Sequence, residues 1–268
     1  MIEISEFDGV TQIRMSREVK GEPLFWVSAY LVDDLLIDSG CMHTSVELMD
    51  FLDSRQISRV VNTHYHEDHI GANGLLQERR NVEILAHEWS LDFIGNPPGL
   101  PRYREQAWGK PLGSSAGRCP DFLETENYKL EVVDTPGHCP GHISLVERTR
   151  GWVFSGDLFI GRELWVAGPE TDVTDMIRSM KNLMSMHSGE FTLLTSLRTI
   201  RRDGRKALSG FVSRYQELAQ LAKSLASSGM DTKSIVNRLF GQESVFDAMT
   251  AGQYSSANLV KLLLEAEI

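Results

Sequence analysis

The sequence predicts a layered α/β protein with a helical extension, and two observations carry this prediction. Between residues 11 and 86, short β-branched and aliphatic runs alternate with stretches whose apolar residues recur at helical spacing. After Asp203 the pattern changes to helical runs alone. We therefore expect a main α/β domain over residues 1–204 and an α-helical C-terminal extension over residues 205–268.

Individual elements follow from local periodicity. Strands are expected at residues 11–15, 25–32, 35–38, 59–63, 82–86, 128–134, 143–148, 151–155 and 191–195. Helices are expected at residues 45–54, 74–79, 174–186, 205–227, 234–239 and 255–267. Asp33 and Asp34 form a tight hairpin turn between two of the strands, and Asp231 or Thr232 is suited to cap a C-terminal helix.

Residues 96–120 break this regular pattern. They are rich in Pro, Gly and Ser, as in NPPGLP and PLGSSAG. Long irregular segments within compact domains are often functional, so we interpret this one as a candidate lid over a site.

Composition narrows the kinds of molecule that the protein could bind and the compartment in which it works. The net charge of −10 disfavours nucleic acid and anionic membranes as partners. We find no signal-peptide pattern at the start and no apolar run that could span a bilayer, and we expect a cytoplasmic protein. Three cysteines at no zinc-ribbon spacing fit a reducing compartment. The C-terminal helices and a Trp-bearing loop offer a homodimer interface.

The stretch VVNTHYHEDHIGAN, residues 60–73, concentrates metal-ligand residues. Residues two apart in an extended segment point the same way, so His64 and His66 can converge on one ion. If a helix begins near Glu67, Asp68 and His69 leave from its first turn toward a neighbouring position. A solvated loop or satisfied core histidines would be the alternative, but the density of ligand types favours a metal site.

Two later motifs supply further ligands at strand ends. DTPGHCPGH, residues 134–142, provides His138, and VFSGDLF, residues 153–159, provides Asp157. The Asp157 carboxylate could bridge two ions or bind one, or it could merely stabilise a turn. His142 could support the site or be structural, and Arg162 and Trp165 could contact a substrate.

Together with LIDSG at residues 36–40, these motifs resemble, in order, those of the metallo-β-lactamase superfamily and especially its glyoxalase II-like hydrolases. The resemblance covers residues 30–204 and implies an αβ/βα four-layer sandwich of two mixed β-sheets flanked by helices. It implies that Asp157 bridges two metals and that Asp38 supports the ligands by hydrogen bonding. The implied ligands are His64, His66 and His138 for the first metal, and Asp68 and His69 for the second.

The chain departs from this family at the fifth motif. Relatives place a histidine after a late strand to complete the second metal position, whereas residues 192–199 read TLLTSLRT and put Leu197 there. The second ion could bind with more water, be absent, or be held by His187. We expect a weakened or empty second position.

The resemblance implies a metal-dependent hydrolase of a small ester, thioester or lactone-like substrate that uses a metal-activated water. Zinc is the default ion, with iron or manganese as alternatives. Asp68, if it binds no second metal, can orient the water or accept its proton. One alternative is a mononuclear iron oxygenase of the persulfide dioxygenase kind, with His64, His138 and Asp157 as its ligands. The other is a degenerate binding protein without catalysis.

Overall fold

The computed structural model describes residues 1–161, 164–197 and 199–267, and it divides them into two compact units. The first unit comprises Met1–Asp134, Gly141–Asp157 and Thr192–Arg201, and the second comprises Thr135–Pro140, Leu158–Phe191 and Arg202–Ile268. Arg162, considered above as a substrate contact, and Arg198 in the fifth motif lie outside the described residues.

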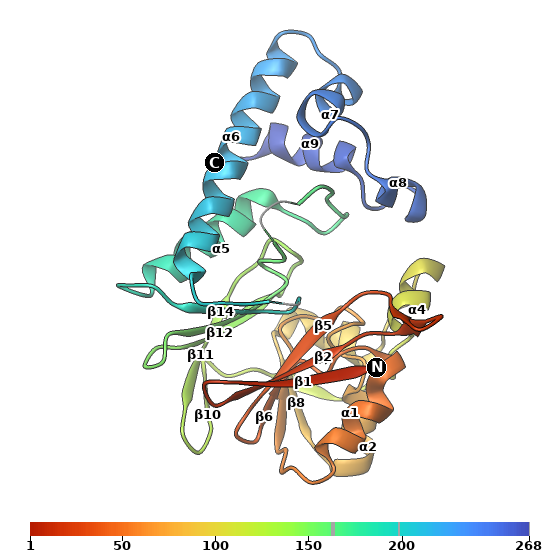
Figure 1. Ribbon diagram of the computed structural model, residues 1–268, viewed down its shortest axis with the longest axis vertical. Helices are drawn as coiled ribbons and strands as arrows, with labels where there is room; N and C mark the ends of the chain where they lie inside the picture. Colours follow the sequence, from red (N-terminus) through yellow and green to blue (C-terminus); the bar gives the residue numbers. More distant parts are fainter. Residues whose placement is uncertain (162–163, 198, 268) are drawn as a thin grey trace. The chain divides into compact units, whose positions relative to one another are not determined.

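The first unit contains two large mixed sheets. The first sheet has the strand order β1-β2-β5-β6-β7-β8-β9 and the second β10-β11-β12-β13-β14-β15 (Figure 1). The first sheet's strands are β1 (Ile2–Phe7), β2 (Val10–Met15), β5 (Val27–Val32), β6 (Leu35–Ile37), β7 (Arg59–Val61), β8 (Glu83–Ala86) and β9 (Ala116–Arg118). The second sheet's are β10 (Phe122–Glu124), β11 (Lys129–Asp134), β12 (Ile143–Glu147), β13 (Trp152–Gly156), β14 (Thr192–Thr195) and β15 (Ile200–Arg201). A separate ribbon pairs β3 (Glu18–Val19) with β4 (Glu22–Pro23).

An apolar core joins the two sheets. Tyr30 and Leu35 from the first sheet pack in one cluster with Leu145, Trp152 and Phe154 from the second. Every residue of β5 is buried, because alternate side chains of this strand enter two different cores. Each large apolar side chain buried in this way stabilises the fold by roughly 1.5–3 kcal/mol.

Helices cover the other face of the first sheet. Leu48 and Leu52 of α1 (Ser45–Leu52) and Leu76 of α2 (Asn73–Arg80) pack in a second cluster with Val60 and Ile84 of the strands. Shorter helices complete this unit: η1 (Met42–Thr44), η2 (Glu88–Ser90), α3 (Leu91–Gly95) and α4 (Arg102–Trp108). The expected α/β class with two mixed sheets is confirmed.

The second unit is mainly helical. It contains α5 (Val173–Ser185), α6 (Gly204–Ser227), α7 (Thr232–Phe240), α8 (Val245–Met249) and α9 (Ser256–Glu265). Helix α6 packs against α5, α7 and α9. Asp231 caps α7 by accepting a hydrogen bond from the Ser234 N–H, as one of the two cap predictions requires. In the described part of the chain, no helix is both long and apolar enough to cross a membrane.

Several predicted elements need correction. Residues 96–120 are not wholly irregular, because they include α4 and β9. Asp68 and His69 do not leave from a helical first turn: the chain makes hydrogen-bonded turns there and α2 begins only at Asn73. The reason is that His69 and Ile70 both donate to the His66 carbonyl, and Gly71 then donates to Gly40 outside the loop. Strand β1 was not predicted.

Candidate metal centre

Several of the predicted site residues follow strand ends in the first unit. Asp38 follows β6, His64 and His66 follow β7, and Asp157 follows β13. Strands β6 and β7 run parallel, so their carboxyl ends lie at the same edge of the sheet. The Asp38 N–H donates to the Val61 carbonyl at 2.9 Å, which joins the two strand ends directly.

Asp38 connects the β7 loop to His69. Its buried carboxylate accepts the Thr63 N–H at 2.8 Å and the Thr63 hydroxyl at 2.9 Å. The second of its oxygens, Oδ2, also lies 2.8 Å from His69 Nδ1. When Nδ1–H of an imidazole donates to a carboxylate, the lone pair of Nε2 is directed away and available to a metal. The supporting role that the resemblance implied for Asp38 stays a prediction.

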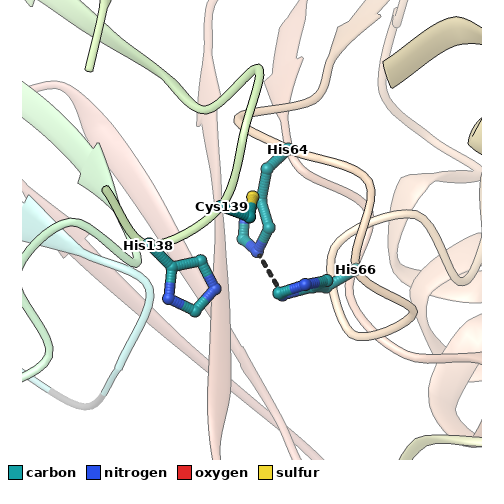
Figure 2. A group of neighbouring side chains, drawn as sticks. All are labelled: His64, His66, His138 and Cys139. Atoms are coloured by element: carbon teal, nitrogen blue, oxygen red, sulfur yellow. Dashed lines mark hydrogen bonds between the residues drawn. The ribbon is translucent and has the colours of Figure 1, made fainter. Parts of the chain in front are cut away.

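His64 and His66 converge, as Figure 2 shows. His64 Nε2 lies 3.0 Å from His66 Nδ1, and both side chains are buried. This contact is the hydrogen bond drawn in Figure 2. It is shorter than the roughly 3.4 Å between two nitrogen ligands at 2.0–2.1 Å from a tetrahedral zinc ion, so a small separation would let both atoms bind one ion. His138 and Cys139, also drawn in Figure 2, belong to the second unit.

His69 faces two carboxylates. Its Nε2 lies 3.3 Å from Asp157 Oδ1 and 3.8 Å from Asp68 Oδ2. This nitrogen is buried and has no hydrogen-bond partner among the described residues. Ligand atoms of His64, His69 and Asp157 lie within 4.8 Å of one another. Two imidazole nitrogens and a carboxylate oxygen this close together form a donor set that fits a divalent cation.

The local charges also favour a cation. Burial acts to lower the pKa of His69, but the carboxylates of Asp38, Asp68 and Asp157 outweigh it and raise that pKa well above its usual value. Burial raises the pKa of Asp68 to about 6; the charge of His69 opposes this rise, while Glu67 and Asp157 add to it. The negative field that holds the second proton on His69 would also favour a metal ion at Nε2, where the ion would replace that proton.

Asp157 is fixed from two sides. Its N–H donates to His142 Nε2 at 3.1 Å, and its Oδ1 accepts a hydrogen bond from the Ser196 hydroxyl. Gly156 precedes it with a φ of +46°, and an added Cβ there would lie 2.7 Å from His142 Nε2. The close approach of the histidine therefore requires glycine at this position.

His138 lies in the turn that follows β11. This turn, Thr135–Pro140, is the first segment of the second unit. The turn is tied to the helix α5 segment, because the Gly137 carbonyl accepts the Asp172 N–H at 2.7 Å. The Pro136 carbonyl accepts the Ser179 hydroxyl at 2.8 Å. A ligand role for His138 stays a prediction.

The turn after β14 carries Leu197 in place of the expected histidine. The Leu197 carbonyl accepts the Ser28 hydroxyl at 2.9 Å, and the Thr195 carbonyl accepts the Tyr30 hydroxyl at 2.6 Å. Gln12 Nε2 donates to that same Ser28 hydroxyl at 3.1 Å. The apolar Leu197 side chain offers no ligand atom. His187 lies in the second unit, where its ring packs 4.8 Å from that of Phe191, and its suggested rescue of the site stays a prediction.

Three contacts of this region were missed from the sequence. Thr63 bonds Asp38, Ser196 bonds Asp157, and Arg104 pairs with Glu67 inside the HYHEDH motif. Thr63 and Ser196 lie at or just beyond the ends of predicted strands, and that position could have indicated that they contact the site. Arg104 lies 37 residues from its partner and had no local signal.

Comparison with known proteins settles the family. The family model described as "Metallo-beta-lactamase superfamily" matches residues 25–189, more than half of the chain. The chain belongs to the metallo-β-lactamase superfamily. The expected resemblance is thereby confirmed.

Relatives within this superfamily are similar over part of their lengths. A probable metallo-hydrolase, YqgX of Bacillus subtilis, is 30% identical over 57% of this chain and 76% of its own. The hydroxyacylglutathione hydrolase GloC of Haemophilus influenzae is 31% identical over 44% of this chain and 58% of its own. A solved β-lactamase domain protein from Burkholderia ambifaria is 20% identical, covers 98% of this chain and 88% of its own, and has a TM-score of 0.76. The family and the names of the two hydrolases support an enzyme of the metal-dependent hydrolase type.

Proposed function

We propose that the protein hydrolyses a small ester, thioester or lactone-like substrate with the help of a divalent metal ion. His64, His66 and His138 would hold the ion together with Asp157. The observation that carries the proposal is the 3.0 Å approach of His64 Nε2 to His66 Nδ1 in a buried setting. The relatives' names, which are those of hydrolases, support the reaction class.

Asp68 is our candidate for proton transfer. When bound, the ion lowers the pKa of a coordinated water and polarises the substrate carbonyl. The Asp68 carboxyl, with a pKa raised by burial to about 6, can accept a proton at Oδ2 near neutral pH. Asp38 holds the His69 ring in place beside it through the Nδ1 contact. Zinc is the ion we expect first, with iron or manganese next, because histidine and carboxylate ligands suit all three.

One feature of this chain favours a second candidate. Leu197 removes a ligand from the second metal position, which leaves His64, His138 and Asp157 as a possible two-histidine, one-carboxylate set. Such sets serve mononuclear iron oxygenases, so persulfide oxidation is the alternative reaction. Oxygen uptake with a persulfide separates it from hydrolysis, in which no oxygen is consumed.

The test combines metal content with a substrate screen. Purified protein would be loaded with zinc, iron or manganese, its metal measured by elemental analysis, and its activity assayed on ester, lactone, thioester and phosphodiester substrates. His64→Ala, loaded in parallel, should lose most of the metal and all of the activity. Full metal occupancy in that variant would refute the site, and inactivity of every metal form would favour a degenerate binding protein.

A further inference from the structure

An ion pair between Arg104 and the buried Glu67 ties helix α4 to the HYHEDH motif. Arg104 Nε donates to Glu67 Oε1 at 2.6 Å, and Arg104 Nη2 donates to Glu67 Oε2 at 2.7 Å. The Glu67 side chain is only 3% exposed. Two parallel hydrogen bonds between a guanidinium and a carboxylate fix the relative orientation of the two groups as well as their distance.

Helix α4 makes further contacts that hold it down. The Arg17 guanidinium donates to the Gln106 carbonyl, and a His43 ring nitrogen lies 3.1 Å from the Glu105 carbonyl. Gly109, which ends the helix with a φ of +79°, packs so closely that an added Cβ would lie 3.0 Å from Met42 Cβ. The middle of the segment that was interpreted as a lid is therefore fastened to its surroundings.

Glu67 stands between two predicted ligands in a loop without regular structure. The loop runs from Asn62 to Ala72 and contains neither helix nor strand, so backbone turns and side-chain contacts together fix its shape. Asp38 holds the loop at Thr63 and at His69. Arg104 holds it between those points, at the residue that connects His66 to Asp68.

We propose that Arg104 is a positioning residue for the metal centre, acting through Glu67 on His66 and Asp68. This inference rests on the proposed metal site. A buried carboxylate needs its partner, and without the guanidinium Glu67 would turn toward solvent and carry the neighbouring backbone with it. Contacts that orient metal ligands from outside typically change metal affinity 10–100-fold when lost.

The test uses cobalt(II) as the probe, because its visible spectrum reports the geometry of its ligands. The informative variant is the double substitution Glu67→Gln with Arg104→Gln, which removes the link without leaving a charge buried. The single Arg104→Gln is measured beside it. Arg148→Gln is the matched control, since it breaks an exposed arginine–glutamate pair with Glu131 on the second sheet. Affinity is measured by chelator competition, and folding of each metal-free variant by thermal unfolding.

We expect the double variant to fold, to bind cobalt 10–100-fold more weakly and to show altered absorption bands, while Arg148→Gln matches the wild type. Cobalt affinity within twofold of wild type and an unchanged spectrum in the double variant would overturn the positioning role, even if the thermal midpoint falls. If the wild type itself binds no cobalt, the proposed function fails first and this inference falls with it. The two failures are therefore distinguishable.

Discussion

Replacing Asp38 by Asn tests the support of the metal centre with little change in shape. Asp38 has a φ of +60°, a conformation that asparagine adopts more readily than most residues, so the backbone should tolerate the change. The amide oxygen of the asparagine can still accept the Thr63 N–H, as Oδ1 does now. The amide nitrogen then takes the place of Oδ2, which currently faces the Thr63 hydroxyl and His69 Nδ1.

That exchange should move the His69 proton from Nδ1 to Nε2. An amide N–H cannot accept the Nδ1–H, so the imidazole must move its proton to Nε2 or lose the contact. A protonated Nε2 cannot bind a metal. His69 is an implied ligand of the second metal position, so we expect the affinity of that position to fall 10–100-fold, which is about 1.4–2.7 kcal/mol. Lost charge-assisted hydrogen bonding should also lower the free energy of unfolding by roughly 1.5–3 kcal/mol.

The assay is chelator competition for zinc, with urea unfolding of the metal-free protein as the second measurement. Asp8→Asn is the control, because Asp8 also has a positive φ, of 51°, but lies in the β1–β2 turn away from His69. Affinity for a second zinc ion within threefold of wild type in Asp38→Asn would refute the reasoning about the His69 proton.

Three further substitutions test other parts of the structure. Leu197→His should raise the zinc content, measured by elemental analysis, from near one toward two ions per chain; two ions in the unmodified protein would contradict a weakened second position. Gly71→Ala should lower the free energy of unfolding by about 1–3 kcal/mol, because its Cβ would lie 2.3 Å from main-chain atoms, whereas Gly99→Ala meets nothing within 4 Å. Burial acts to raise the pKa of Asp33, but hydrogen bonds from the β10–β11 turn outweigh it and lower that pKa. The stability that the Asp33 carboxylate contributes to the fold is therefore present at neutral pH and lost as pH falls through the lowered pKa. Urea unfolding of Asp33→Asn should therefore differ from wild type at pH 7 and converge with it in acid; an equal gap at both pH values would argue against this.

Local patterns predicted most of the elements that surround the centre. The hairpin of β5 and β6 turns at Asp33 and Asp34, and helix α5 begins within one residue of its expected start. Strand β1 was missed although its sequence IEISEF alternates, because none of its six residues is buried and four are exposed on an edge strand. Helix α4 was missed because the flanking prolines and glycines masked a short helical stretch.

The candidate site was predictable only where ligands recur at short spacing. HYHEDH contains His64, His66 and His69 within one loop, so their convergence follows from a few backbone angles. The pairing of Glu67 with Arg104 depends instead on how a distant helix packs, and no pattern in one sequence encodes that packing. Sequence motifs thus indicate which atoms could bind a metal, whereas the tertiary structure supplies the contacts that hold them.

The absence of the fifth-motif histidine is more than the loss of one side chain. The turn that would carry it is anchored by Ser28 and Tyr30, and burial raises the pKa of Tyr30, so its hydroxyl keeps the proton that it donates to Thr195. The anchored turn brings the Ser196 hydroxyl to Asp157 Oδ1, the same oxygen that lies 3.3 Å from His69 Nε2. A second ion at this oxygen would have to compete with the serine proton as well as bind without the missing imidazole. Restoring the imidazole alone should therefore give partial occupancy of the second position, and removing the Ser196 hydroxyl in the same chain should raise it further.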